Sequence, residues 1–429
     1  MKNSRRESMS SKLRILKTYL KYKNRHFKDH EDLKRYQEKQ IRKQLKFVST
    51  HSEIYEEYQG KPLSSYPLMD KKQMMANFDR LNTVGTNREE AMKLAIDSER
   101  SRDFSEKLNH ITVGLSSGTS DTRGIFLVSD KEKDMWAGYI LSKVLYGSIL
   151  DKYEVAFFMR ANSNLYESVS SSNIHFVFYD IYKSSEENIE KLKEQKPDII
   201  VGQPSILLDL SNYASELKPR KIISIAEVLE DRDREVICKA FNCDVIHQVY
   251  QCTEGCLATT CEYGTIHLNE DIVYFEKEYL DEKRFIPVIT DFTRTSQPII
   301  RYRLNDILVE RREPCPCGSC FTALERIEGR EDDVFVFDGE DGNMVEIYPD
   351  FIRRLVLFSG DVRDYRIVQT EDGSLEVYWN EDDNMQSAFL NELQKMSEDR
   401  LFEMPAVSFY AYSFDRKKKL KRVESRRNR

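Results

Sequence analysis

Hydrophobic residues occur in short blocks along the middle of the chain, and amphipathic segments separate these blocks. The blocks are rich in β-branched and aromatic side chains, which predicts strands at 111–113, 125–128, 155–159, 174–180, 198–202, 221–225 and 245–250. Apolar residues at helical spacing predict helices between the later blocks, at 185–195, 206–217 and 231–241. Earlier in the chain, residues 67–72 indicate a loop into another helix, with Asp70 as its candidate cap. Strands that alternate with helices indicate an α/β domain with a largely parallel sheet.

The pattern changes toward both ends of the chain. Residues 8–48 show helical spacing with a thin apolar stripe among dense charges, which predicts a helical segment packed on the surface of a larger body. From residue 265 the strands become shorter, which predicts an antiparallel subdomain, and from about residue 332 a compact α+β unit follows. We therefore expect three parts, at 1–48, 49–330 and 331–429.

Composition narrows the class of protein. A chain of 429 residues exceeds what one core usually fills, and its 40% hydrophobic content is that of a folded globular protein. No stretch approaches the roughly 18 uninterrupted apolar residues of a membrane span. The basic N-terminus leads into no apolar core, so we expect a cytoplasmic protein without a secretory signal. Its eight cysteines then represent thiols or metal ligands rather than disulfides.

Charge is unevenly distributed. The net charge of −7 argues against nucleic acid as the main partner. Both ends are nevertheless basic, over 2–46 and 416–429, so the middle is acidic. Basic ends of this kind can contact anionic surfaces such as lipid, or they can form a solvated helix face and a fraying tail. Association with a second copy of the chain, as a homodimer, is a further alternative.

The run Gly-Leu-Ser-Ser-Gly-Thr-Ser-Asp-Thr-Arg-Gly at 114–124 is the first candidate for chemistry. It lies between two predicted strands, and its hydroxyl and backbone N–H groups suit a polyphosphate. It is not a Walker A loop, which requires Gly-Lys-Ser/Thr and opens directly into a helix. Residues 129–132 follow with the spacing of a capping box, which predicts strand, loop, strand and capped helix in that order. Alone, a run of this kind is most often an ordinary loop.

Three further segments follow this loop: Tyr-Gln-Cys-Thr-Glu-Gly at 250–255, Tyr-Arg-Leu-Asn-Asp at 302–306 with Gly-Arg-Glu-Asp-Asp at 329–333, and a lysine-rich segment at 417–423. In this order they resemble the adenylate-forming superfamily of acyl-CoA ligases, luciferases and peptide-synthetase adenylation domains. The likeness extends from about Tyr36 to Val423 and is stronger for the phenylacetate–CoA ligase branch. Within that branch, the chain is most similar to adenylate-forming proteins associated with capsule biosynthesis and with adenylation of a deazaflavin coenzyme.

The resemblance implies a large N-terminal domain of stacked α/β sheets with a small antiparallel β subdomain, followed by a small mobile α+β lid. It also implies roles, because activating a carboxylate with ATP requires a held triphosphate, Mg²⁺ and neutralised charge at the α-phosphate. Thr253 would donate to the α-phosphate, Glu254 would hold Mg²⁺, and Asp306 would accept the ribose hydroxyls. The remaining implied residues are Ser116, Ser117, Gly118, Thr119 and Ser120 at the phosphates, Ala226, Glu227 and Tyr250 along the nucleotide, Arg330 near it, and Asp332 at the hinge.

Two positions depart from the family pattern. The closing motif of the family carries a Gly-Lys pair, and here Lys418 and Lys419 stand in its place. We choose Lys419 as the lysine that reaches the α-phosphate, with Lys417, Lys418 and Lys421 as competitors and a solvated basic tail as the alternative. Asp121 occupies a glycine position, and a carboxylate beside a triphosphate is repulsive unless Mg²⁺ or Arg123 pairs with it.

Three cysteines and one histidine form a second constellation. Cys261, His267, Cys315 and Cys317 match the ligand set of a closed structural zinc site, and the phenylacetate–CoA ligase branch resembles this chain at both segments. Cys320 is the alternate thiol, and four unligated residues are the alternative reading.

The sequence thus predicts ATP-dependent adenylation of a carboxylic acid, followed by transfer to coenzyme A, in a polysaccharide or secondary-metabolite pathway. Phe157, Phe158 and Tyr250 suggest an aromatic or apolar acid, and Arg160 could meet an anionic one. Two alternatives stay open: adenylyl transfer to an acceptor that is not a carboxylate, and a catalytically weak nucleotide-binding scaffold.

Overall fold

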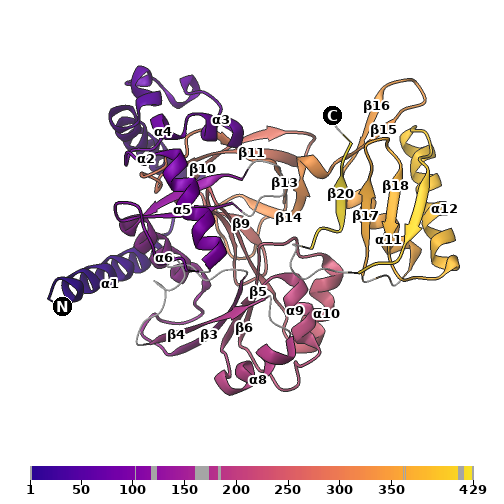
Figure 1. Ribbon diagram of the computed structural model, residues 1–429, viewed down its shortest axis with the longest axis horizontal. Coiled ribbons are helices and arrows are strands. Elements are labelled where there is room, and N and C mark those ends of the chain that lie inside the picture. The colour runs from indigo at the N-terminus through magenta and orange to yellow at the C-terminus, as the bar shows by residue number, and fades with distance from the viewer. Residues whose placement is uncertain are drawn as a thin grey trace. The chain divides into compact units, whose positions relative to one another are not determined.

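The chain has a mixed α/β fold, as predicted (Figure 1). The computed structural model describes residues 2–101, 103–116, 123–159, 173–181, 185–360, 362, 364–413 and 420–427. It divides into two compact units, of which the first comprises Met1–Leu304 with Glu310–Glu325 and the second comprises Asn305–Val309 with Arg326–Arg429. None of the described helices combines the length and the apolar character needed to cross a bilayer.

A parallel sheet forms the centre of the first unit and confirms the predicted alternation of strands and helices. Its neighbours run in the order β4-β3-β5-β6-β7, all parallel, and β8 and β9 extend it antiparallel. The strands are β3 (Tyr153–Met159), β4 (Ile174–Asp180), β5 (Ile199–Gly202), β6 (Lys221–Ile225), β7 (His247–Cys252), β8 (Gly255–Thr260) and β9 (Ile266–Leu268). The intervening helices are α8 (Ser185–Gln195), α9 (Pro204–Ser211) and α10 (Asp231–Phe241).

Both faces of this sheet are buried, which explains the continuous apolar runs in its strands. On one face, Phe158 and Ile200 pack against side chains of α8, α9 and α10, including Ile237. On the other face, Val155 and Ile199 pack against α6 (Asp130–Val144).

A hairpin of β1 (Ile111–Leu115) and β2 (Ile125–Ser129) precedes α6 and packs on α5 (Arg88–Ser101). The predicted capping box is confirmed: Ser129 accepts a hydrogen bond from the backbone N–H of Glu132, and the Glu132 carboxylate accepts one from the backbone N–H of Ser129 at 2.8 Å. The two strands and the capped helix therefore follow one another as expected.

The N-terminal region forms two helices rather than the single helical segment expected over 8–48. α1 (Lys2–Lys23) ends before a short connection, and Asp29 caps the start of α2 (His30–His51) by accepting the backbone N–H of Asp32 at 2.9 Å. The cap at Asp29 starts a new helix, and the charged residues on both sides of it gave no sign of this break in the sequence. Two shorter helices follow, α3 (Lys71–Ala76) and α4 (Phe78–Leu81).

The predicted antiparallel segment begins with the hairpin of β10 (Val273–Tyr279) and β11 (Arg284–Asp291), and β12 (Tyr302–Arg303) pairs with β11. Two more strands, β13 (Asp306–Glu310) and β14 (Ala323–Arg330), carry the chain across the boundary between the units.

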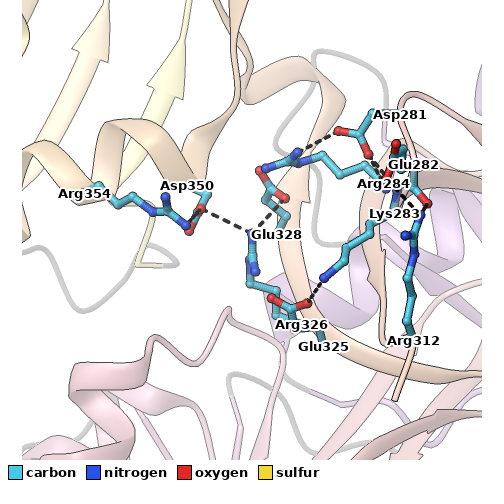
Figure 2. Close-up of polar contacts among 10 residues, drawn as sticks. All are labelled: Asp281, Glu282, Lys283, Arg284, Arg312, Glu325, Arg326, Glu328, Asp350 and Arg354. Atoms are coloured by element: carbon cyan, nitrogen blue, oxygen red, sulfur yellow. Dashed lines mark hydrogen bonds and ion pairs between the residues drawn. The ribbon is translucent and has the colours of Figure 1, made fainter. Parts of the chain in front are cut away.

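The second unit has its own core. Its sheet runs β19-β18-β17-β20, a separate hairpin joins β15 to β16, and Trp379 stacks on Phe409 with ring centroids 5.5 Å apart. Arg326 forms ion pairs with Glu328 at 3.6 Å and with Asp350 at 3.2 Å. Figure 2 shows its side chain between these two carboxylates. The elements are β15 (Phe335–Asp338), β16 (Met344–Ile347), α11 (Pro349–Ser359), β17 (Arg366–Gln369), β18 (Leu375–Tyr378), α12 (Asp383–Arg400), β19 (Val407–Tyr410) and β20 (Val423–Ser425).

Candidate functional site

A pocket in the first unit brings together segments that are far apart in the sequence. The β1–β2 hairpin contributes Ser116 and Gly124, and the turn after β7 contributes Thr253 and Glu254. The wall also includes Lys71, Met74, Met75, Ile125, Phe126, Arg294, Gln297, Ile299 and Tyr302. Three residues implied by the resemblance, Ser116, Thr253 and Glu254, therefore line one cavity together with Gly124, which ends the predicted phosphate loop.

Ser116 and Gly124 form the neck of the predicted phosphate loop. The backbone N–H of Ser116 donates to the carbonyl of Gly124 at 2.8 Å, and the backbone N–H of Gly124 donates to the Ser116 hydroxyl at 2.9 Å. The implied phosphate ligands between them, Ser117, Gly118, Thr119 and Ser120, lie outside the described residues, as does Asp121. Beside the neck, the Arg123 guanidinium makes two 2.7 Å hydrogen bonds to Glu99, so this arginine already has a carboxylate partner.

Glu254 lies at the centre of a short polar chain. The Thr253 hydroxyl donates to the Glu254 carboxylate at 2.8 Å. Burial and the negative charge of Glu254 raise the pKa of Tyr302, whose hydroxyl is also hydrogen-bonded to that carboxylate. Tyr302 therefore stays neutral and can act as a donor to Glu254.

Arg294 connects the two sides of the pocket. Its guanidinium donates to the carbonyl of Thr253 and to the carbonyl of Leu127 in β2, both at 3.1 Å. Burial alone would raise the pKa of Glu132, but the positive charge of Arg294 and hydrogen bonds from Ser129 and Ser296 keep that pKa below its usual range. The buried Glu132 also accepts the backbone N–H of Thr295 at 2.6 Å, so it fixes the segment that carries Arg294.

The predicted adenine segment lies at the same edge of the sheet as Thr253. Ala226 directly follows β6, Thr253 directly follows β7, and these strands are parallel neighbours with Ile225 opposite Val249. The carboxyl ends of parallel strands are where α/β proteins usually bind ligands. Ala226 has a φ of +66°, a strained conformation for a residue with a Cβ atom, and strain of this kind concentrates at functional sites.

Glu227 and Tyr250 flank this edge. The Glu227 carboxylate accepts a hydrogen bond from the Ser205 hydroxyl at 2.9 Å, and Tyr250 lies within β7. Phe157 and Phe158, which were suggested to contact the acid, are adjacent residues of β3 and therefore point to opposite faces of the sheet. Phe158 is stacked on Tyr179 in the buried core, so the suggestion that it contacts the acid is wrong. Adjacent strand residues point to opposite faces, and a run that is apolar on both faces does not reveal which side meets a ligand.

The second unit gathers the later motif residues. Arg330 at the end of β14 forms an ion pair with Asp306 at the start of β13, with 3.8 Å between Nε and Oδ1. The Asn305 side chain donates to Asp332, the implied hinge residue, at 2.8 Å. Because Asn305 directly precedes Asp306, this hydrogen bond links the hinge residue to the implied ribose ligand. Gly329, near the end of β14, has a φ of +144°, a conformation that favours glycine.

One of the competing lysines is already paired. Lys421 forms a 2.6 Å ion pair with the buried Asp333. Burial raises the pKa of Asp333, against the opposing positive charge of Lys421. Lys419, Lys417 and Lys418 lie outside the described residues, as does Arg160.

The four metal-ligand candidates converge in the first unit. The ligand atoms of Cys261, His267, Cys315 and Cys317 all lie within 4.8 Å of one another. The Cys261 and Cys315 sulfurs are 3.7 Å apart, and Zn–S bonds of about 2.3 Å in a tetrahedron place two sulfurs about 3.8 Å apart. Nδ1 of His267 lies 3.1 Å from the carbonyl of Phe321, an outer contact that leaves Nε2 facing the cysteines.

The sequence analysis assigned no role in the site to three residues of the pocket: Lys71, Arg294 and Tyr302. Lys71 begins α3, where the Asp70 cap was predicted, but nothing local indicates that its side chain reaches the loop neck. Its Cε lies 3.3 Å from where a Cβ on Gly124 would stand. Arg294 contacts Thr253 and Leu127, which are 41 and 167 positions away, and Tyr302 contacts Glu254 from another segment, so only the fold reveals these contacts.

Comparison with known proteins gives two curated relatives. CapK of Staphylococcus aureus is 27% identical over 198 residues, which cover 44% of this chain and 43% of CapK. Phenylacetate–coenzyme A ligase of Thermus thermophilus is 30% identical over 90 residues, which cover 21% of this chain and 19% of that enzyme. The chain therefore matches less than half the length of each of these relatives. No family model matches the chain.

A solved structure extends the likeness over nearly the whole chain. 2-Hydroxyisobutyryl-CoA ligase, in the postadenylation state with R3-HIB-AMP, has a TM-score of 0.66 and 16% identity, covering 94% of this chain and 91% of the ligase chain. At this identity the match establishes the fold, which is the predicted one.

The Arg294 interactions predict a stability effect that a mutant pair can separate. Arg294→Met removes the cation beside the buried Glu132 and both carbonyl contacts, so we expect the free energy of unfolding to fall by about 3 kcal/mol. Arg294→Lys keeps the charge but cannot bond both carbonyls in the same way, so its loss should be smaller. Urea unfolding measures both, with the exposed Arg88→Met as the control. Equal stability of Arg294→Met and wild type would contradict this role.

Proposed function

We infer the function of this chain from its relationship to the phenylacetate–CoA ligase-like branch of the adenylate-forming proteins. We propose that it activates a carboxylic acid with ATP, forming an acyl adenylate and pyrophosphate. The observation that carries this proposal is the single pocket lined by Ser116, Gly124, Thr253 and Glu254. These residues come from two separate segments: the β1–β2 hairpin holds the neck of the phosphate loop, and the turn after β7 holds Thr253 and Glu254.

The proposed step joins a carboxylate oxygen of the acid to the α-phosphorus of ATP, while the bond from that phosphorus to the bridging β-oxygen breaks. The Thr253 hydroxyl would donate to the α-phosphate as charge builds there. The neck formed by Ser116 and Gly124 would place the loop backbone along the β- and γ-phosphates. By the resemblance, Asp306 would accept the ribose hydroxyls and Arg330, its ion-pair partner, would lie near the nucleotide.

The carboxylate of Glu254 fits the hard oxygen ligand that Mg²⁺ prefers, and it lines the pocket. When bound, Mg²⁺ would neutralise phosphate charge. The neutral hydroxyls of Thr253 and Tyr302 hold the carboxylate in place without competing as cations. Glu254 is therefore positioned by the chain before any metal binds.

We propose that Lys71 supplies a cation to the triphosphate, because Arg123, the one cation of the 114–124 run, is paired with Glu99. Most of the superfamily ends this loop with lysine, whereas this chain has none between 114 and 124. Lys71 reaches the loop neck from α3 and lines the pocket. An ammonium group there would bind triphosphate oxygens as a point charge.

Transfer of the acyl group to coenzyme A is the second half of the proposal, supported by the shared fold with a CoA ligase. A thiol would attack the acyl carbonyl and release AMP. The alternative, adenylyl transfer to another acceptor, would give an adenylylated product that free coenzyme A does not consume. Acid-dependent release of AMP with and without coenzyme A separates these two outcomes.

We also propose that Cys261, His267, Cys315 and Cys317 bind a structural zinc ion. Three thiolates and an imidazole form a closed set with no position left for substrate. The ion would tie the turn after β8 to the segment between β13 and β14, which lies in the same unit.

Exchange of labelled pyrophosphate into ATP tests the adenylation step directly. Over a panel of aryl and aliphatic acids, we expect at least one acid to drive the exchange. Glu254→Gln should lower the exchange rate by about 100-fold or more, because it removes the anionic metal ligand. The exposed neighbour Glu262→Gln is the control and should exchange at the wild-type rate. Tight ATP binding with no exchange for any acid would instead favour the scaffold alternative.

Lys71 can be tested against its own neighbour. Lys71→Met should raise the KM for ATP about tenfold, because it removes a charge-assisted contact to phosphate, while the KM for the acid stays unchanged. Lys72→Met is the matched control, since Lys72 is exposed in the same helix turn. An unchanged KM for ATP in Lys71→Met would rule out this assignment.

Metal analysis tests the zinc proposal. We expect one zinc per chain in the purified protein, and loss of that zinc in Cys261→Ser and Cys317→Ser. Cys320→Ser should retain it, because Cys320 lies outside the cluster. At free zinc one hundred times its dissociation constant, the ion should add about 2.7 kcal/mol to the free energy of unfolding. Loss of zinc in Cys320→Ser, or its absence from wild type, would contradict this ligand set.

A further inference from the structure

The helix α1 is fixed to the first unit through one face. The Arg14 guanidinium forms a 2.6 Å ion pair with Asp134 of α6, whose side chain is only 1% exposed. At Gly138 the two helices touch so closely that a Cβ there would lie 2.4 Å from the carbonyl oxygen of Ile15. Tyr19 is buried in the core between α6 and the sheet. The orientation of α1 around its own axis is therefore set.

The opposite face of α1 carries an exposed apolar stripe. Met9, Leu13, Leu16 and Leu20 are 73%, 52%, 36% and 48% exposed. Their spacing of four, three and four residues aligns them in one row along the helix. A row of four exposed large apolar side chains is unusual on a surface where such residues normally occur singly.

Lysines border this stripe on both sides. At 100° per residue, Lys12 and Lys23 fall on one side of the row, and Lys17 and Lys21 fall on the other. Lys21 and Lys23 donate hydrogen bonds to the Tyr22 hydroxyl and the Leu145 carbonyl, whereas Lys12 and Lys17 are exposed, one on each side of the row. The chain has no Asp or Glu from residue 8 to residue 23. An apolar row between two rows of long cationic side chains is the arrangement of helices that lie in a membrane interface, where lysines extend toward headgroups.

We propose that this outward face of α1 binds an anionic lipid surface, with the helix axis in the plane of the membrane. The leucines would enter the boundary between headgroups and acyl chains, and Lys12 and Lys17 would contact lipid phosphates or carboxylates. This inference goes beyond the proposed function and does not depend on it.

Charge argues against a second copy of the chain as the occupant. If two α1 helices packed through this row, the lysines beside it would face lysines of the other copy in either orientation, which is repulsive. A convex row with cations on both sides instead fits a flat, deformable anionic surface.

Co-sedimentation of the full chain with vesicles tests the proposal. We expect binding to vesicles of phosphatidylcholine with phosphatidylglycerol, weak or no binding to phosphatidylcholine alone, and release in 0.5 M salt, about the concentration that screens such contacts. Lys12→Gln with Lys17→Gln should weaken binding about 25-fold, at about fivefold per lysine. Leu13→Ser with Leu16→Ser should weaken it about tenfold.

Matched controls separate this surface from general charge and hydrophobicity. Lys93→Gln with Lys239→Gln removes two exposed lysines elsewhere, and Leu357→Ser with Phe358→Ser removes two exposed apolar side chains of the second unit. Both should bind like wild type. Circular dichroism and ATP-pyrophosphate exchange check that each variant is folded, and the lipid test on wild type stands even if no acid supports exchange.

Three results would overturn the proposal. The first is a wild-type protein that does not bind anionic vesicles at low salt. The second is equal loss of binding in the control variants. The third is a concentration-dependent dimer that disappears in Leu13→Ser with Leu16→Ser while vesicle binding is unaffected, which would identify a second copy as the occupant.

Discussion

The hydrogen bonds of Arg294 to the carbonyls of Leu127 and Thr253 hold the two walls of the pocket together. One wall is the hairpin that presents the phosphate loop, and the other is the turn after β7. The buried carboxylate of Glu132 stabilises the charge of Arg294 and is itself fixed by its helix cap. A capping interaction at the start of α6 is thus connected, through the charge of Arg294, to the geometry around Glu254.

The sheet topology explains why these residues lie at one edge. Parallel neighbours end at the same side, so the turns after β6 and β7 bring Ala226 and Thr253 together without any special contact between them. Burial of both sheet faces makes this frame rigid, and the strained Ala226 can persist because its surroundings hold it. The proposed chemistry therefore rests on loops at the end of a packed core. The proposed membrane surface is separate, because α1 presents its outward face whether or not nucleotide is bound.

Local patterns predicted the local structure well. The strands, the capping box at Ser129 and the cap at Asp70 follow from nearby residues. The cysteine and histidine set and the order of motifs came from resemblance, and the structure brings the four candidate ligands together. Arg294, Tyr302 and Lys71 could not be found this way, because their partners lie in other segments. Phe158 was misassigned for a related reason: a strand that is apolar on both faces hides which face meets the helices.

Isotope transfer from the acid to AMP is the most direct measurement of the proposed reaction. With a carboxylate labelled with ¹⁸O, attack on the α-phosphorus places one labelled oxygen in the acyl adenylate bridge, and cleavage at the carbonyl leaves that oxygen in AMP. We predict ¹⁸O in AMP for an acid that supports turnover. Unlabelled AMP, or ADP formed together with labelled inorganic phosphate, would contradict adenylation at this pocket.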